Sequence, residues 1–130
     1  MNAAVRYYSR SGNTKALAEA IANAANTMAI SVDQKDAAIT EPVDVLFIGG
    51  ALYAYGLDKH LKDYLKTLKQ GDAKKAVVFS TSWVSKHAID LIKQGLSEAG
   101  IPAEEKYFYV KKTPDAKQLE EAMKFAKQYL

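Results

Sequence analysis

Hydroxyl-bearing residues and a glycine are concentrated in the six residues Ser9-Arg10-Ser11-Gly12-Asn13-Thr14. The segment follows an apolar run and precedes an alanine-rich segment with helical spacing. A loop that joins a strand to a helix points free backbone N–H groups and the positive end of the helix dipole at one place. Three hydroxyls would add neutral donors there. The sequence therefore predicts a phosphate-binding loop that needs no lysine.

The loop has two other possible interpretations, a different nucleotide-binding motif and an ordinary helix cap. The common nucleotide signatures Gly-x-Gly-x-x-Gly and Gly-x-x-x-x-Gly-Lys-Ser/Thr are both absent. Ser11 or Asn13 could simply cap an ordinary helix, as serine and asparagine often do. A cap needs one such residue, whereas this loop supplies several, so phosphate binding is the preferred interpretation.

Composition narrows the class of protein. The chain has 130 residues, of which 48% are hydrophobic, enough for a core in one compact domain over residues 1–130. The absence of cysteine excludes disulfides and iron–sulfur ligation. The 18 Lys and Arg are interleaved with 15 Asp and Glu, giving a net charge of +3 and little reason to expect nucleic-acid binding. No signal peptide or membrane span is expected, which predicts a cytoplasmic protein.

Strand-like and helical segments alternate along the chain. Strands are expected at residues 3–8, 29–32, 44–50, 76–80 and 106–110, and the continuous apolar run at 44–50 should lie centrally. Helices are expected after Thr14, where Leu17, Ile21, Ala24 and Met28 share one face, and over residues 57–68, 88–99 and 113–130. This alternation predicts an α/β fold with a doubly wound five-stranded parallel sheet in the order 2-1-3-4-5 and helices on both faces.

Two features fit this fold poorly. Residues 33–43 leave space for only about one helical turn, where a crossover usually takes a dozen or more residues. Arg6 lies inside an expected central strand, and its guanidinium is expected to reach an edge of the sheet.

The topology brings three loops to one edge of the sheet. In open parallel sheets, ligands bind beyond the carboxyl ends of the strands where the strand order reverses. The loops there are residues 9–14, 49–57 and 80–87. The second has permissive glycines and two tyrosines, and the third carries the only tryptophan. Each aromatic residue alone is more often a packing residue, but their convergence predicts a site for a flat ligand.

The first loop resembles the flavodoxin phosphate loop, Ser/Thr-x-Thr/Ser-Gly-x-Thr, and residues 45–51, with the Tyr and Gly that follow, look like the third strand of that family and its loop. The resemblance implies a flavodoxin-like domain that binds FMN and carries electrons between redox partner proteins, as a monomer or weak dimer, without catalytic residues or a metal. The cofactor-binding residues it implies are Ser9, Arg10, Ser11, Gly12, Asn13, Thr14, Gly50, Ala51, Tyr53, Tyr55, Gly56, Thr81, Ser82 and Trp83.

The chain departs from that family in its charge. Flavodoxins are typically acidic near the flavin ring, whereas this chain places Lys59, His60, Lys86 and His87 just beyond the second and third loops. Cations there should lower the energy of a reduced, negatively charged flavin. We therefore expect a less strongly reducing flavin and a partner with an acidic or neutral docking face. The two histidines are second-rank acid–base candidates.

Two alternative functions use related folds. Residues 48–56 also look like flavodoxin-like protoporphyrinogen oxidases, so a flavin-dependent oxidoreductase, including a quinone reductase, stays open. Residues 81–103 nevertheless leave little room for a large-substrate pocket. A phosphorelay receiver is suggested only by the Lys and Pro of residues 110–114. It is rejected because Tyr7-Tyr8 and Gly49-Gly50 stand where acidic residues would hold Mg²⁺.

Overall fold

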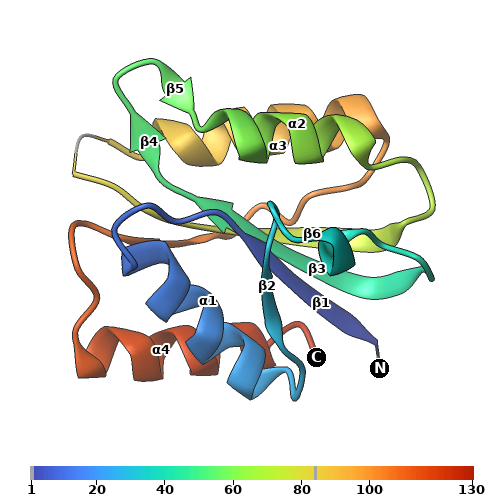
Figure 1. Ribbon diagram of the computed structural model, residues 1–130. Coiled ribbons are helices and arrows are strands. Elements are labelled where there is room, and N and C mark those ends of the chain that lie inside the picture. Colours follow the sequence, from blue (N-terminus) through green and yellow to red (C-terminus); the bar gives the residue numbers. More distant parts are fainter. Residues whose placement is uncertain (1, 84) are drawn as a thin grey trace.

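A five-stranded parallel sheet lies between two layers of helices (Figure 1). The computed structural model describes residues 2–83 and 85–130. The sheet strands are β1 (Ala3–Tyr7), β2 (Ala29–Ser31), β3 (Val43–Gly50), β6 (Ala73–Thr81) and β7 (Phe108–Val110). The α-helices are α1 (Asn13–Ala24), α2 (Lys59–Thr67), α3 (His87–Ala99) and α4 (Ala116–Lys127).

The order of the sheet is β2-β1-β3-β6-β7, and all four pairings are parallel. The labels β4 (Leu52–Tyr53) and β5 (Gly56–Leu57) belong to a separate antiparallel hairpin. When only the strands of the main sheet are numbered, the order is the predicted 2-1-3-4-5. The five-stranded parallel sheet is therefore confirmed, and the hairpin is an addition that the sequence did not predict.

Two apolar cores lie between the sheet and its helices, one on each face of the sheet. One contains Leu17 and Ile21 of α1 together with Ala122 of α4, and the other contains Leu61 of α2 and Ile92 of α3. Figure 1 shows these pairs on opposite faces of the sheet. In β3 the four residues from 45 to 48 are fully buried, as expected for a central strand covered on both faces. None of the described helices is long and apolar enough to cross a membrane.

The first helix is shorter than its apolar spacing predicted. It ends at Ala24, and Asn26 then adopts a left-handed backbone conformation with φ 54°. Met28, expected on the buried face, is instead 76% exposed. The helix stops early because asparagine tolerates the left-handed conformation that ends many helices.

Arg6 of β1 forms a hydrogen bond to the unusually short connection between β2 and β3. That connection contains one turn of 3₁₀ helix, η1 (Lys35–Ala37), which agrees with the single turn expected. The Arg6 side chain is buried and its Nε donates to the Ala37 carbonyl at 2.7 Å. The Tyr64 hydroxyl donates to the same carbonyl at 2.6 Å. Arg6 therefore satisfies a buried carbonyl of the crossover, which explains a charged residue in a central strand.

Candidate functional site

Four loops surround a cleft of about 290 Å³ at the carboxyl ends of the central strands. They follow β1, β3, β6 and β7. The lining residues are Arg10, Ser11, Asn13, Ala51, Leu52, Tyr53, Thr81, Ser82, Trp83 and Lys112. Three of these loops are those that the sequence placed at this edge, so residues far apart in the chain come together as predicted. The fourth loop was not expected to take part.

The loop from Ser9 to Thr14 is folded around the start of α1. Gly12 adopts φ 94°, a left-handed conformation that glycine takes without strain, and its carbonyl accepts the first helical hydrogen bond from Ala16. The Gly12 N–H donates to the Ser9 Oγ at 3.0 Å, and the Asn13 N–H lies 3.4 Å from the Ser11 Oγ. A Cβ at Gly12 would meet no atom within 4 Å, so the space above the loop is open.

Thr14 joins this loop to the loop after β6. Its side chain is only 1% exposed, and its hydroxyl lies 2.6 Å from the Thr81 hydroxyl. Thr81 and Ser82 are both buried at the base of the cleft. Thr14 therefore fixes the spacing of the two loops.

Arg10 joins the first loop to the hairpin that follows β3. Its guanidinium lies 4.0 Å from the centroid of the Tyr53 ring and also donates to the Tyr55 hydroxyl. Its Nε and Nη2 donate to one carboxylate oxygen of Asp58, at 3.0 and 2.5 Å. A cation above an aromatic face is attractive, and hydrogen bonds to a carboxylate are the stronger kind. Arg10 thus contacts both tyrosines of the hairpin, of which Tyr53 lines the cleft.

Asp58 is the buried acceptor of this arrangement. Its Oδ1 caps α2 by accepting the His60 N–H at 2.7 Å and lies 2.9 Å from His60 Nδ1, whereas Arg10 bonds the other oxygen, Oδ2. Burial raises the pKa of Asp58, but the hydrogen bonds from His60 and Arg10 outweigh that effect and lower the pKa below its ordinary value. Asp58 is therefore ionised near neutral pH, and its charge balances that of Arg10.

Tyr53 stays a neutral phenol. Burial raises its pKa above the ordinary value and outweighs the opposing effect of the Arg10 charge. The ring lies 6.1 Å from the Tyr55 ring, at 23° between the planes. Tyr53 therefore adds a neutral aromatic ring to the cleft beside the charged Arg10, and such a ring suits contact with a flat ligand.

Six of the predicted site residues do not line the cleft but shape its loops. Besides Ser9, Gly12 and Thr14, they are Gly50, Tyr55 and Gly56. A Cβ at Gly50 would lie 2.5 Å from Leu61, so glycine is needed there for the packing of α2. Gly56 adopts φ 107° at the start of β5, directly after the two-residue turn, and pairs with Tyr53 across the hairpin.

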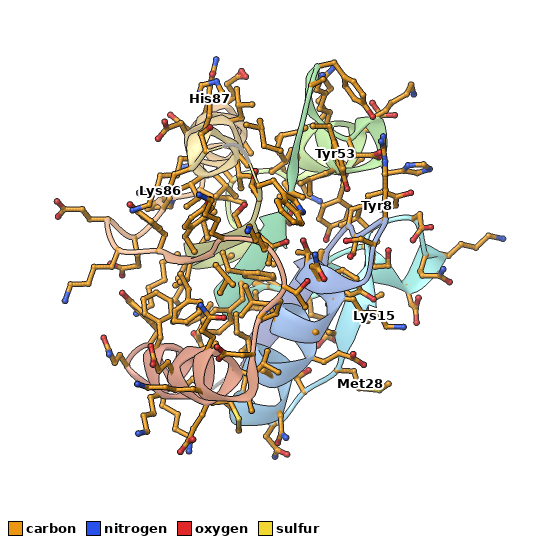
Figure 2. The ribbon with its side chains drawn as sticks, turned by 90° about the vertical axis from the view of Figure 1, so that its left-hand side faces the viewer. Tyr8, Lys15, Met28, Tyr53, Lys86 and His87 are labelled. Atoms are coloured by element: carbon orange, nitrogen blue, oxygen red, sulfur yellow. The ribbon has the colours of Figure 1, made fainter. Side chains whose placement is uncertain are left out.

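The basic residues beyond the loops do not enter the cleft. Lys59 pairs with Asp63 at 2.7 Å, and Lys86 lies 5.6 Å from the Tyr109 ring. Figure 2 shows Lys86 and His87 at the start of α3, on the other side of the site from Tyr8 and Tyr53. The cations that line the cleft are instead Arg10 and Lys112.

Leu52 and Lys112 are lining residues that the sequence interpretation missed. Leu52 lies in the unexpected hairpin. Lys112 follows β7, whose carboxyl end lies beside that of β6. The signal for Lys112 was therefore present in the predicted strand order, because the loop after the fifth strand must emerge at the same edge as the other three.

The geometry fits a ligand that has both a phosphate and a flat ring. The first loop offers backbone N–H groups, hydroxyls and open space at a helix start, and no carboxylate lines the cleft among the described residues. Tyr53 and Trp83 supply aromatic surfaces from two different loops.

The fold and this cleft define an open, doubly wound α/β protein with a ligand site at the point where the strand order reverses. The family model of the flavodoxin domain matches residues 4–125, so the chain belongs to the flavodoxin family. No curated protein gives a significant sequence match.

Solved structures with similar folds include free-standing proteins and one larger protein. A flavodoxin from the domain Archaea has 25% identity and a TM-score of 0.84, with 99% of this chain and 96% of that chain covered. Flavodoxin 1 from Bacillus cereus has 22% identity and a TM-score of 0.80, with 99% and 97% covered. Rubredoxin oxygen:oxidoreductase from Desulfovibrio gigas has 14% identity and a TM-score of 0.85, with 98% of this chain but only 34% of that chain covered.

Proposed function

We propose that this chain binds FMN in the cleft and carries electrons between redox partner proteins. The observation that carries the proposal is the meeting of the Ser9–Thr14 loop with aromatic walls from two other loops. Membership of the flavodoxin family supports it independently. Bound FMN would supply the redox chemistry by taking up two electrons and one proton, which leaves its ring with one negative charge.

Different residues of the chain would bind the phosphate and the ring of FMN. The backbone N–H groups of residues 9–14 and the hydroxyls of Ser9 and Ser11 would hold the phosphate, which is a dianion and forms charge-assisted hydrogen bonds. The buried Thr14 hydroxyl would support the loop through Thr81. Tyr53 and Trp83 would flank the ring and exclude water from part of its surface. Of the remaining predicted contacts, the backbone near Ala51, Thr81 and Ser82 would meet the ring edge, whereas Gly50 and Gly56 shape the loops that carry it.

The alternative oxidoreductase function is not favoured. The connection between β6 and β7 consists mainly of α3, with no insertion to form a large-substrate pocket. The cleft is small, and its exposed aromatic residues suit contact with another protein better than enclosure of a substrate. We propose that the chain acts as a single domain in the cytoplasm, as a monomer or weak dimer.

The docking face is proposed to surround the cleft. Tyr55 and Trp83 are 59% and 64% exposed there, which is unusual for large aromatic side chains. Lys112 adds positive charge beside Trp83. A redox partner with an acidic or neutral face fits this surface, and raising the salt concentration should slow electron transfer to an acidic partner.

The decisive experiment compares the binding of FMN and riboflavin, which differ by the phosphate. Replacing Ser11, a hydroxyl residue that lines the cleft, by alanine should weaken FMN binding about tenfold more than riboflavin binding, since one lost charge-assisted bond is worth about 1.5 kcal/mol. The control is Ser97→Ala, an exposed hydroxyl on α3. A thermal melt separates misfolding from lost binding. Equal weakening of both ligands in a folded variant would refute the phosphate-loop assignment.

A further inference from the structure

Lys112 has an unusual backbone conformation for a long side chain. Its φ is 68°, and the only other non-glycine residue with positive φ among the described residues is Asn26. Asparagine tolerates this left-handed region, whereas lysine gains nothing from it locally. A residue held there against its preference is kept in place by its surroundings, and such positions concentrate at functional sites.

The side chain of Lys112 is directed to the cleft. Its Nζ lies 4.8 Å from the centroid of the Trp83 ring, and the residue lines the same cleft as Arg10 and Tyr53. The cleft therefore contains two cation–aromatic pairs, Lys112 with Trp83 and Arg10 with Tyr53. A cation at this distance from a tryptophan face restrains both side chains.

The two cations that line the cleft differ in whether a neighbouring carboxylate neutralises their charge. Arg10 is paired with the buried carboxylate of Asp58, so its charge is largely balanced within the protein. Within residues 2–83 and 85–130, Lys112 has no carboxylate within ion-pair distance, and none lines the cleft. Lys112 is thus the cation of the cleft whose charge a ligand would experience.

We propose that Lys112 tunes the redox potential of the bound flavin by favouring its reduced, negatively charged form. The proposal rests on the proposed function and adds a fourth loop to the site. Lys112 is a positioning residue for Trp83 and a source of positive charge for the ring. Since the oxidised ring is neutral and the reduced ring is anionic, Lys112 should bind the reduced state more tightly and raise the two-electron midpoint potential.

An effect of Lys112 on the phosphate rather than on the ring would give a different result in a redox titration. If its charge acted on the phosphate, Lys112 would strengthen the binding of oxidised and reduced FMN equally, because the phosphate charge is the same in both states. The midpoint potential would then stay unchanged when Lys112 is replaced. The potential therefore separates an effect on the ring from an effect on the phosphate.

The test compares Lys112→Gln with Lys111→Gln in the FMN-loaded protein. Both changes remove one positive charge from the same loop, but Lys111 does not line the cleft. The potential is measured by equilibration with a redox dye of known potential, at low and high salt. In Lys112→Gln, the affinity for reduced flavin relative to that for oxidised flavin should fall about three- to tenfold. This fall corresponds to a negative shift of about 15 to 30 mV in the two-electron midpoint potential. The shift should persist in part at high salt, and Lys111→Gln should show less than a third of it.

Two further variants distinguish an effect of the Lys112 charge on the potential from an effect of its backbone conformation. Lys112→Gly removes the charge and also relieves the left-handed backbone, so the apoprotein should melt at a higher temperature while the potential falls as in Lys112→Gln. Lys112→Arg keeps the charge and should retain the wild-type potential.

The outcomes separate this proposal from the function on which it rests. A wild-type protein without saturable FMN binding would refute the proposed function and the role of Lys112 together. Normal FMN binding with an unchanged potential in Lys112→Gln would refute the role of Lys112 alone. Equal shifts in Lys112→Gln and Lys111→Gln would likewise overturn it, because the effect would then come from net charge rather than from the cleft.

Discussion

Replacing Asp58 tests whether its buried carboxylate joins the Ser9–Thr14 loop to the hairpin of β4 and β5, through Arg10. Asp58 is only 4% exposed and has two structural roles, as the cap of α2 and as the partner of Arg10. Asp58→Asn keeps an oxygen for the cap but removes the charge. Asp58→Ala removes both. The two variants therefore separate the contribution of the charge from that of the cap.

The expected loss of stability follows from these contacts. A helix cap of this kind contributes about 1 kcal/mol to the free energy of unfolding. The ion pair with Arg10 contributes about 1 kcal/mol more, below the usual value for a buried pair because the Arg10 side chain is 46% exposed to screening water. Asp58→Asn should thus lose about 1 kcal/mol and Asp58→Ala about 2 kcal/mol, or about 8 °C in melting temperature for the latter.

The pH dependence of this loss follows from the lowered pKa of Asp58. A carboxyl whose pKa is lower in the folded than in the unfolded protein stabilises the fold above its unfolded pKa, near 3.8. That contribution is lost as the pH falls through the folded pKa. The stability difference between wild type and Asp58→Asn should therefore be constant near neutral pH and shrink below about pH 4.

The assay is urea denaturation of the apoprotein at several pH values, followed by circular dichroism. Asp63→Ala is the matched control, because Asp63 lies on the same helix but pairs with Lys59 at the exposed surface. Its stability should equal that of wild type within error. If Asp58→Ala were as stable as Asp63→Ala, Asp58 would not hold the two loops together.

Two further predictions concern the surroundings of the cleft. Trp83 emission should be strongly quenched when FMN is added to the apoprotein, and Trp83→Ala should abolish that response; unchanged emission at saturating flavin would make Trp83 a packing residue. Lys59→Glu combined with Lys86→Glu should lower the midpoint potential less than Lys112→Gln does, because neither lysine lines the cleft. A redox titration that finds the larger shift in the double variant would contradict the placement of these lysines.

The sequence predicted those parts of the molecule that depend on local pattern and on topology. Continuous apolar runs indicated β3 and β6, because a strand covered on both faces must be apolar along its length. The strand order then placed the loops after β1, β3 and β6 at one edge. Thr14 and Thr81 illustrate the result, since residues 67 positions apart in the chain form a hydrogen bond in the structure.

The parts that were not predicted depend on tertiary contacts. The hairpin of β4 and β5 has strands of two residues, too short for any periodicity to show. Arg6 contradicts the apolar pattern of a central strand, and its role depends on the distant carbonyl of Ala37. The left-handed conformation of Lys112 has no signal in the sequence, because lysine does not favour it.

The positions of basic residues along the sequence did not predict which cations line the cleft. Lys59 and Lys86 stand closer in the chain to the loops, yet one is paired with Asp63 and the other lies near Tyr109. Arg10 reaches the cleft, but Asp58 balances it. Electrostatic effects depend on distance and on compensation by neighbouring charges, so we expect a single uncompensated cation in the cleft to outweigh several paired or screened cations outside it. The sign of the effect on the flavin stays a prediction, and we now assign it to Lys112 rather than to Lys59 and Lys86.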